Sequence, residues 1–275
     1  MRSLKLLMVL MACAAITAAA AAGNPSDEMF QAYSGQNFSI AKKLALKQSN
    51  TPEGKLILAL CLIHDRESQD IPQGFKKLGE LYRDSNLSEW LKIEVALSYA
   101  RVAQLMQDRK DIYGNAADGV KFSDIYNEIL KTSPDSTEAC YAIVYKNAPL
   151  IESSDDAVSA KAFQDVEKFI KSFKGDPKLL SPVHLFAEYE YIAVKKDYRL
   201  ALEHLEAAVK LGIANPTMEQ DNMFRIGRIY QIKLGDKQKA IEAYNKFLGK
   251  FPSSNRVPIV ERYLEELGAK KQGTY

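Results

Sequence analysis

The chain has 275 residues, of which 47% are hydrophobic and 26% are charged, and its 37 basic and 35 acidic side chains give a formal charge of +2. This composition excludes an intrinsically disordered chain, which would be poorer in apolar residues and further from neutrality. The near-neutral charge argues against a general nucleic-acid-binding protein. Three cysteines are too few for a disulfide-rich scaffold.

The N-terminal segment, residues 1–23, has the pattern of an export signal. Arg2 and Lys5 form a positive start, residues 6–15 are apolar, and a run of alanines from 18 to 22 leads into Gly23. These are the three regions of a secretory signal peptide, so we expect export to a bacterial periplasm or secretion. Removing residues 1–23 would leave equal numbers of basic and acidic side chains, because both of its charged residues are basic.

An alternative processing route starts from the segment Leu10-Met11-Ala12-Cys13, which resembles a lipobox. Lipidation of Cys13 would make the protein an outer-membrane lipoprotein. The residues after Cys13 stay apolar, whereas a lipoprotein usually turns polar soon after its cysteine, so we favour soluble release. No second apolar stretch approaches the roughly 20 residues that a membrane-spanning helix needs.

Residues 24–268 contain an internal repeat. The segments 197–205 and 236–244 are similar, and they place Ala201 and Ala240 at equivalent positions. Earlier copies follow at comparable steps, and the interval between the second and third anchors is the longest. The anchor residues are Ala41, Gly74, Phe122, Ala162, Ala201 and Ala240.

Each anchor begins an amphipathic helical pattern. After Ala201, apolar residues recur at 202, 205, 208 and 209, which places them on one face of a helix. A second apolar-periodic stretch precedes the anchor, and a short turn such as Gly235-Asp236 joins the two. The longest interval predicts a long helix over residues 87–106 and a loop over 111–116. The chain has no alternating pattern typical of strands, so we predict an all-α protein.

The pattern resembles the tetratricopeptide repeat, a helix-turn-helix unit, most clearly over residues 180–255. Its period of about 40 residues is longer than the usual period of roughly 34, and in this it is also similar to the Sel1-like repeat. The resemblance implies a right-handed α-solenoid of about six repeats, with an amphipathic C-terminal capping helix over 256–267 and a frayed tail over 269–275. The residues that carry it are Phe224, Gly227, Tyr230, Gly235, Asp236, Ala240, Tyr244, Phe247 and Pro252.

The sequence offers no catalytic, metal or cofactor site. His184 and Glu188 lie four residues apart on one predicted helix, but this pair falls short of the three or four ligands that a zinc site needs. Nucleophile-elbow, P-loop and dinucleotide-binding motifs are missing from the chain. Cys61 and Cys140 fall in repeats that are not neighbours, so we predict two buried free thiols. We therefore expect a non-enzymatic protein without cofactors.

The resemblance implies an interaction scaffold that binds a protein or peptide through the concave face formed by the first helices of its repeats. Glu190, Arg225 and Arg228 are the candidate contact residues, and residues 225–250 hold seven basic and two acidic side chains. A second hypothesis is an envelope assembly factor anchored through Cys13, similar to the outer-membrane β-barrel assembly lipoproteins. A third, an enzyme that acts on an envelope polymer, lacks an identifiable acid–base pair.

Overall fold

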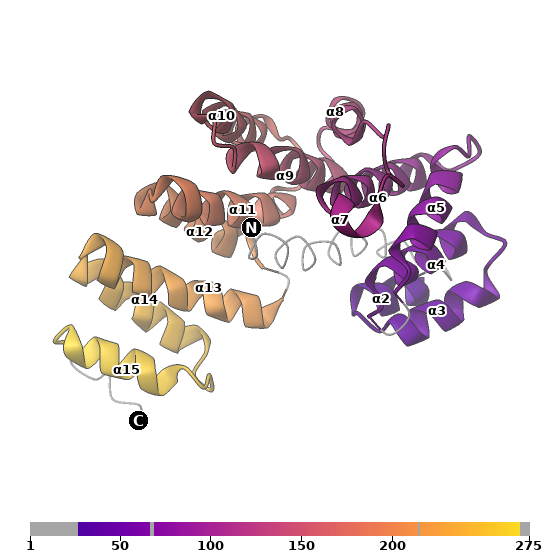
Figure 1. The fold of residues 1–275 in the computed structure, drawn as a ribbon. Coiled ribbons are helices and arrows are strands. Elements are labelled where there is room, and N and C mark those ends of the chain that lie inside the picture. The colour runs from indigo at the N-terminus through magenta and orange to yellow at the C-terminus, as the bar shows by residue number, and fades with distance from the viewer. Residues whose placement is uncertain (1–26, 67–68, 214, 270–275) are drawn as a thin grey trace. The chain divides into compact units, whose positions relative to one another are not determined.

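The computed structural model describes residues 27–66, 69–213 and 215–269, and in these ranges the secondary structure is helical, without strands (Figure 1). The predicted signal segment, with Cys13, lies outside the described residues, as does the predicted tail from residue 270 onward. Among the described helices, none is long and apolar enough to cross a membrane. The chain divides into two compact units, residues 1–146 and 147–275, and the boundary falls inside helix α9.

Unit 1 consists of antiparallel helix pairs. The first helix of each pair packs against the second, which carries the repeat anchor, and the pairs share one hydrophobic core. The pairs are α2 (Asp27–Ser34) with α3 (Phe38–Lys47), α4 (Pro52–His64) with α5 (Ile71–Tyr82), and α6 (Glu89–Asp108) with α8 (Phe122–Thr132), with the short α7 (Lys110–Tyr113) between the last two.

The anchors of the first two pairs lie where the helices approach most closely. Ala41 is fully buried, and Gly74 packs against α4 so closely that an added Cβ would lie 2.6 Å from Cγ1 of Ile63. Both helices of the second pair are capped at their N-termini. At the start of α4, Thr51 accepts a hydrogen bond from the Gly54 amide, and at the start of α5, Asp70 accepts one from the Gln73 amide, both at 3.0 Å. A small residue at the anchor therefore allows the close packing that the repeat pattern predicted.

The third pair departs from the predicted pattern. The long helix is confirmed as α6, but the segment predicted as a loop at 111–116 begins with the one-turn helix α7. Phe122 is the first residue of α8 and is only partly buried. Tyr126, one turn later, is fully buried, and its hydroxyl donates a 2.8 Å hydrogen bond to Oε1 of Gln104 on α6. This buried tyrosine, rather than Phe122, joins the two helices.

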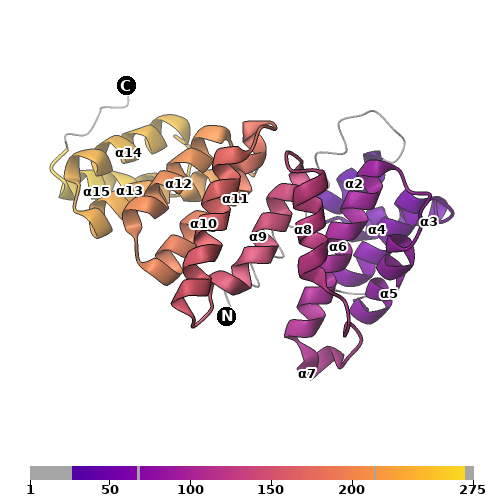
Figure 2. The same cartoon turned by 90° about the horizontal axis from the view of Figure 1, so that it is seen from above.

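Unit 2 continues the series of pairs (Figure 2). In the last two pairs, the first helix ends in a π-helical turn. A π-helical turn holds more residues than a regular α-helical turn, so it lengthens the repeat. The elements are α9 (Thr137–Ile151), which begins in unit 1, α10 (Asp156–Ser172), η2 (Pro177–Leu180), α11 (Ser181–Glu190) with its π-helical end η3 (Tyr191–Lys195), α12 (Tyr198–Leu211), α13 (Pro216–Arg228) with η4 (Ile229–Leu234), α14 (Lys237–Lys250) and α15 (Val257–Glu266).

The turns of the last two pairs repeat each other closely. Lys196 and Gly235 both have left-handed backbone, with φ of 55° and 66°. The next residue in each turn is an aspartate that caps the second helix, accepting hydrogen bonds from the Leu200 amide at 3.1 Å and from the Lys239 amide at 3.0 Å. The anchors Ala201 and Ala240 follow, and both are fully buried. The equivalence of these two segments, predicted from sequence, is confirmed here in three dimensions.

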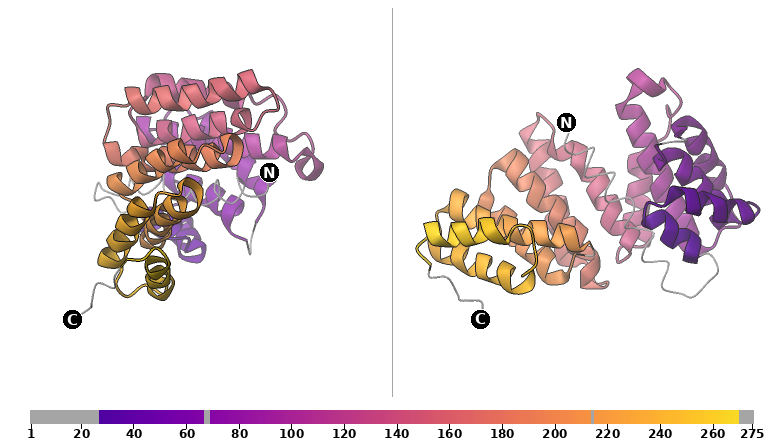
Figure 3. Two further views of the ribbon diagram at one scale, coloured as in Figure 1. Left: turned by 90° about the vertical axis from the view of Figure 1, so that its left-hand side faces the viewer. Right: turned by 90° about the horizontal axis from the view of Figure 1, so that it is seen from below.

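The predicted capping helix is confirmed as α15, which lies beside α14 (Figures 1 and 3). Its inward side chains, Val260 and Leu264, are buried in a cluster with residues of α13 and α14. The prediction for the cysteines is also confirmed, because Cys61 and Cys140 are both buried and free. Burial raises the pKa of each thiol to about 12, so both remain protonated at neutral pH.

Candidate peptide-binding face of helices α11, α13 and α15

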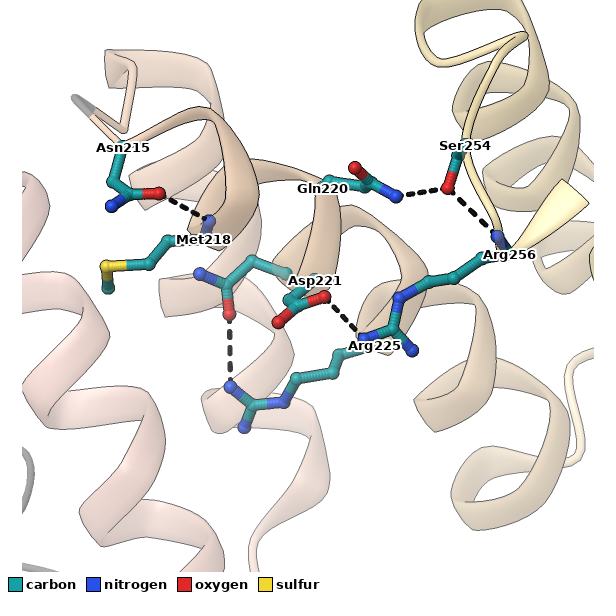
Figure 4. A network of polar contacts seen from close by, with 8 residues as sticks. Asn215, Met218, Gln220, Asp221, Arg225, Ser254 and Arg256 are labelled. Carbon is teal, nitrogen blue, oxygen red and sulfur yellow. Dashed lines mark hydrogen bonds and ion pairs between the residues drawn. The ribbon is translucent and has the colours of Figure 1, made fainter.

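The N-terminal half of α13 is fixed by polar contacts (Figure 4). Asn215 caps the helix by accepting a 3.1 Å hydrogen bond from the Met218 amide. Gln220 hydrogen bonds to the hydroxyl of Ser254, which also accepts a 3.0 Å hydrogen bond from the Arg256 amide. The guanidinium of Arg256 forms an ion pair with Asp221 at 2.5 Å. These contacts join α13 to the segment that leads into α15.

On the other side, Arg225 joins α13 to α11. Its guanidinium pairs with Glu188 and donates a 3.1 Å hydrogen bond to Asn222. The Glu188 side chain is only 1% exposed, whereas that of Arg225 is 43% exposed. Burial raises the pKa of Glu188, and the attraction of Arg225 opposes that rise. Arg225 therefore compensates a buried carboxylate while presenting one edge to solvent.

Arginine and aromatic side chains stack between α13 and α15. The guanidinium of Arg256 lies 4.8 Å from the ring centre of Phe224, and that of Arg228 lies 4.5 Å from the ring centre of Tyr263. The two rings stack with their centres 6.3 Å apart. We call these four partly buried residues the arginine–aromatic layer. It combines cations with π faces, a surface that suits carboxylates and apolar side chains.

Comparison with protein families places part of this layer, Phe224 and Arg228, in a segment that matches a known repeat. Residues 221–254 match the tetratricopeptide repeat family. The chain therefore carries a tetratricopeptide repeat. The match covers most of α13, all of η4 and α14, and the start of the segment before α15. A search of curated proteins found no match.

In this tetratricopeptide repeat, Gly227 packs directly against the ring of Tyr244, which is fully buried. The glycine thus serves the close approach of α13 and α14 that the resemblance implied. The hydroxyl of Tyr244 donates a 2.7 Å hydrogen bond to Gln231, which fixes the second helix against the end of the first. Tetratricopeptide repeats generally mediate protein–protein interactions, so the face formed by such helices is the candidate site.

The structure separates the three predicted contact residues. Arg225 and Arg228 lie on this face, but Glu190 is fully buried, so it does not line an accessible surface as we expected. Its carboxylate has no hydrogen-bond partner among the described residues, and burial together with nearby Glu152 raises its pKa to about 8. The acidic residue that meets Arg225 is instead Glu188.

His184 and Glu188 do not form the edge of a metal site. Glu188 faces Arg225, whereas Nδ1 of His184 lies 2.9 Å from Nδ1 of His204 on α12. Within the described ranges, no group of three His, Cys, Asp or Glu side chains is arranged to hold a metal ion.

Sequence reasoning did not find Asp221, Arg256 or Tyr263. Tyr263 belongs to the apolar stripe of α15, and the other two residues, which pair with each other, lie far apart along the chain. The signal that was available is the repeat itself, because stacked units bring the first helices of neighbouring repeats together.

Proposed function

We propose that this protein is a non-enzymatic interaction scaffold that binds an extended segment of a partner protein on the face of α11, α13 and α15. The observation that carries the proposal is the arginine–aromatic layer, which joins the matched tetratricopeptide repeat to α15 and remains partly exposed. Extended peptides suit such a face because each stacked helix offers the peptide one contact in turn.

The charges of the layer favour a partner with acidic and apolar side chains. Arg256 of the layer and its neighbour Arg225 each already pair with an acid of this chain. Arg228 makes no ion pair within the described part of the chain, and beside its contacts with Tyr263 and Tyr244 its guanidinium can meet a carboxylate of the partner. The ring of Tyr263 beneath it supplies apolar contact.

Site-specific photo-crosslinking in intact cells that produce the protein tests this proposal. A photoreactive phenylalanine replaces Ile232, which is 52% exposed on η4, or Leu200, which is 36% exposed on α12 and serves as the control. We expect a crosslinked partner from position 232, and we expect Arg228→Glu to remove it. The matched charge control is Lys246→Glu on the exposed side of α14, which should leave the crosslink intact.

Two results would contradict the proposed face. The first is equal crosslinking from position 200, and the second is a crosslink from position 232 that Arg228→Glu leaves unchanged. Circular dichroism of each variant must match the wild type, because a loss of fold would remove the crosslink for another reason. Hydrolysis of an envelope polymer by the purified protein would contradict the non-enzymatic role.

We also propose that the scaffold is exported, on the strength of the positive start, apolar middle and small-residue exit of residues 1–23. Mass spectrometry of the mature N-terminus tests this. A start at Gly23 or Asn24 supports soluble release into the periplasm or beyond. A diacylated Cys13 would instead favour the lipid-anchored envelope assembly factor.

A further inference from the structure

Unit 2 has a pocket of about 520 Å³ on the side of α10 that faces η3. A volume of this size accommodates a side chain together with its neighbouring residues. The pocket is formed by one ridge of α10 and by the first residue of η3, so it is separate from the face of α11, α13 and α15 proposed above. The lining residues are Phe163, Gln164, Glu167, Lys168, Lys171, Ser172 and Tyr191.

The floor of the pocket is aromatic and held in place. The rings of Phe163 and Tyr191 are in contact, with their centres 4.7 Å apart. The hydroxyl of Tyr191 donates a 2.9 Å hydrogen bond to Oε1 of Glu167, and Nε2 of His204 lies 2.9 Å from the same oxygen. Residues from three helices thus fix the floor, which leaves an apolar seat that needs little rearrangement to receive a side chain.

The rim of the pocket is basic. Lys168 and Lys171 are exposed on one side of α10, and Lys195 lies with its Nζ 5.3 Å from the ring centre of Phe163. None of the three forms an ion pair with an acid of the described residues. The one acid in the lining, Glu167, is already engaged by Tyr191 and His204. The rim therefore has a surplus of positive charge.

We propose that this pocket binds an acidic peptide segment, whose apolar side chain rests on Phe163 and Tyr191 while flanking carboxylates meet Lys168 and Lys171. Complementary charge selects the segment, and the aromatic floor selects the residue between its acids. This pocket is separate from the face proposed above, and it gives the scaffold a second contact, formed by α10 and the start of η3.

An NMR titration of the full mature chain, residues 24–275 labelled with ¹⁵N, tests the proposal. The probes are the blocked tripeptides Glu-Phe-Glu, Gln-Phe-Gln and Lys-Phe-Lys. We expect Glu-Phe-Glu to shift the amide signals of residues 163–172 and 191. It should bind at least tenfold more tightly than Gln-Phe-Gln, and Lys-Phe-Lys should give no saturable shift. Shifts confined to α13 and α15 would instead report on the other face and would contradict the pocket.

Three variants sharpen the result. The double variant Lys168→Glu and Lys171→Glu should weaken binding of Glu-Phe-Glu at least tenfold. Glu167→Gln should strengthen it about two- to fivefold, because it removes a like charge beside the bound carboxylates. The control, Lys76→Glu with Lys77→Glu on the exposed side of α5, changes the net charge equally and should leave the affinity unchanged. Equal weakening by the control would show a non-specific charge effect and overturn the site.

Discussion

Tyr230 donates a 2.8 Å hydrogen bond to Glu206, and at the equivalent position of the preceding repeat Tyr191 donates a 2.9 Å hydrogen bond to Glu167. In both pairs the tyrosine begins or closely follows the start of a π-helical turn, and the glutamate lies on the second helix of the preceding repeat. The contact is therefore a property of the repeat and joins each unit to the one before it. In both pairs burial and the glutamate raise the pKa of the tyrosine, so its hydroxyl stays protonated and continues to donate.

We predict that Tyr230→Phe lowers the free energy of unfolding by about 1 kcal/mol, less than the roughly 1.5–3 kcal/mol of a hydrogen bond to a charged group because this one is only partly buried. The ring stays in place, so the loss comes from the hydroxyl alone. Urea unfolding followed by circular dichroism measures it. Tyr189→Phe on α11 is the control, because the Tyr189 hydroxyl makes no hydrogen bond to the described residues. Equal effects of the two changes would contradict a role for the Tyr230–Glu206 contact.

Glycines of the last repeat should respond in opposite directions to alanine. A Cβ added at Gly227 would lie 2.6 Å from Cδ1 of the buried Tyr244, so Gly227→Ala should destabilise the protein by about 1–3 kcal/mol. Gly249 lies in the last turn of α14 with nothing within 4 Å of an added Cβ, so Gly249→Ala should stabilise the protein by up to about 0.5 kcal/mol. Thermal unfolding of both variants checks the two signs. A neutral Gly227→Ala would mean that α13 and α14 do not need this close approach.

The helix pairs could be predicted from sequence because their apolar residues recur with the period of a helix. Ala41, Ala201 and Ala240 are all fully buried, as the repeat pattern indicated. The prediction was wrong where local signals were weak. The helix α7 has a single turn and no buried residue, so no apolar periodicity could reveal it. Phe122 matched an anchor by spacing, but the buried contact is made one turn later by Tyr126.

The candidate sites were less predictable because their side chains meet across helices. Glu188 and Glu190 are close neighbours in sequence, yet only Glu188 reaches Arg225, because residues two positions apart project from different sides of a helix. The basic lining of the pocket is visible in the sequence as two lysines of α10, but its floor is not. Glu167 and His204 lie on different repeats and meet only when the repeats stack.

The contact between His184 and His204 fixes where their protons lie. Their Nδ1 atoms are 2.9 Å apart, so one proton lies between them, and Nε2 of His204 faces the carboxylate of Glu167, which can only accept. In the neutral pair, His204 therefore carries its proton on Nε2, and His184 carries its proton on Nδ1.

We predict that His184 stays neutral over most of the acidic range. Burial and the neighbouring His204 lower the pKa of His184 to about 4, so its ring takes up a proton only as the pH falls to about that value. Nitrogen-15 spectra of the histidine rings recorded from pH 8 to pH 4 test this. The variant His204→Gln removes the ring that contacts Nδ1 of His184 and serves for comparison. Titration of His184 near pH 6.5 in the wild-type protein would contradict this prediction.

Glu94 should make unit 1 less stable as the pH rises. It lies on α6 with only 5% of its surface exposed, and burial together with Glu138 raises its pKa from 4.5 to about 7. The folded state therefore binds the proton more tightly than the unfolded state. This contribution to stability is complete below pH 4.5 and is lost as the pH rises through 7.

We therefore predict that Glu94→Gln raises the free energy of unfolding on the order of 2 kcal/mol at pH 8.5, with little effect at pH 4.5. The glutamine can keep the hydrogen bond that the Ser98 hydroxyl donates to Glu94 at 3.3 Å. Urea unfolding followed by the fluorescence of Trp90, the single tryptophan, reports on unit 1 at each pH. Glu89→Gln on the same helix is the control, because the Glu89 side chain is 87% exposed. A benefit of Glu94→Gln that is the same at both pH values would show that the charge of Glu94 does not govern it.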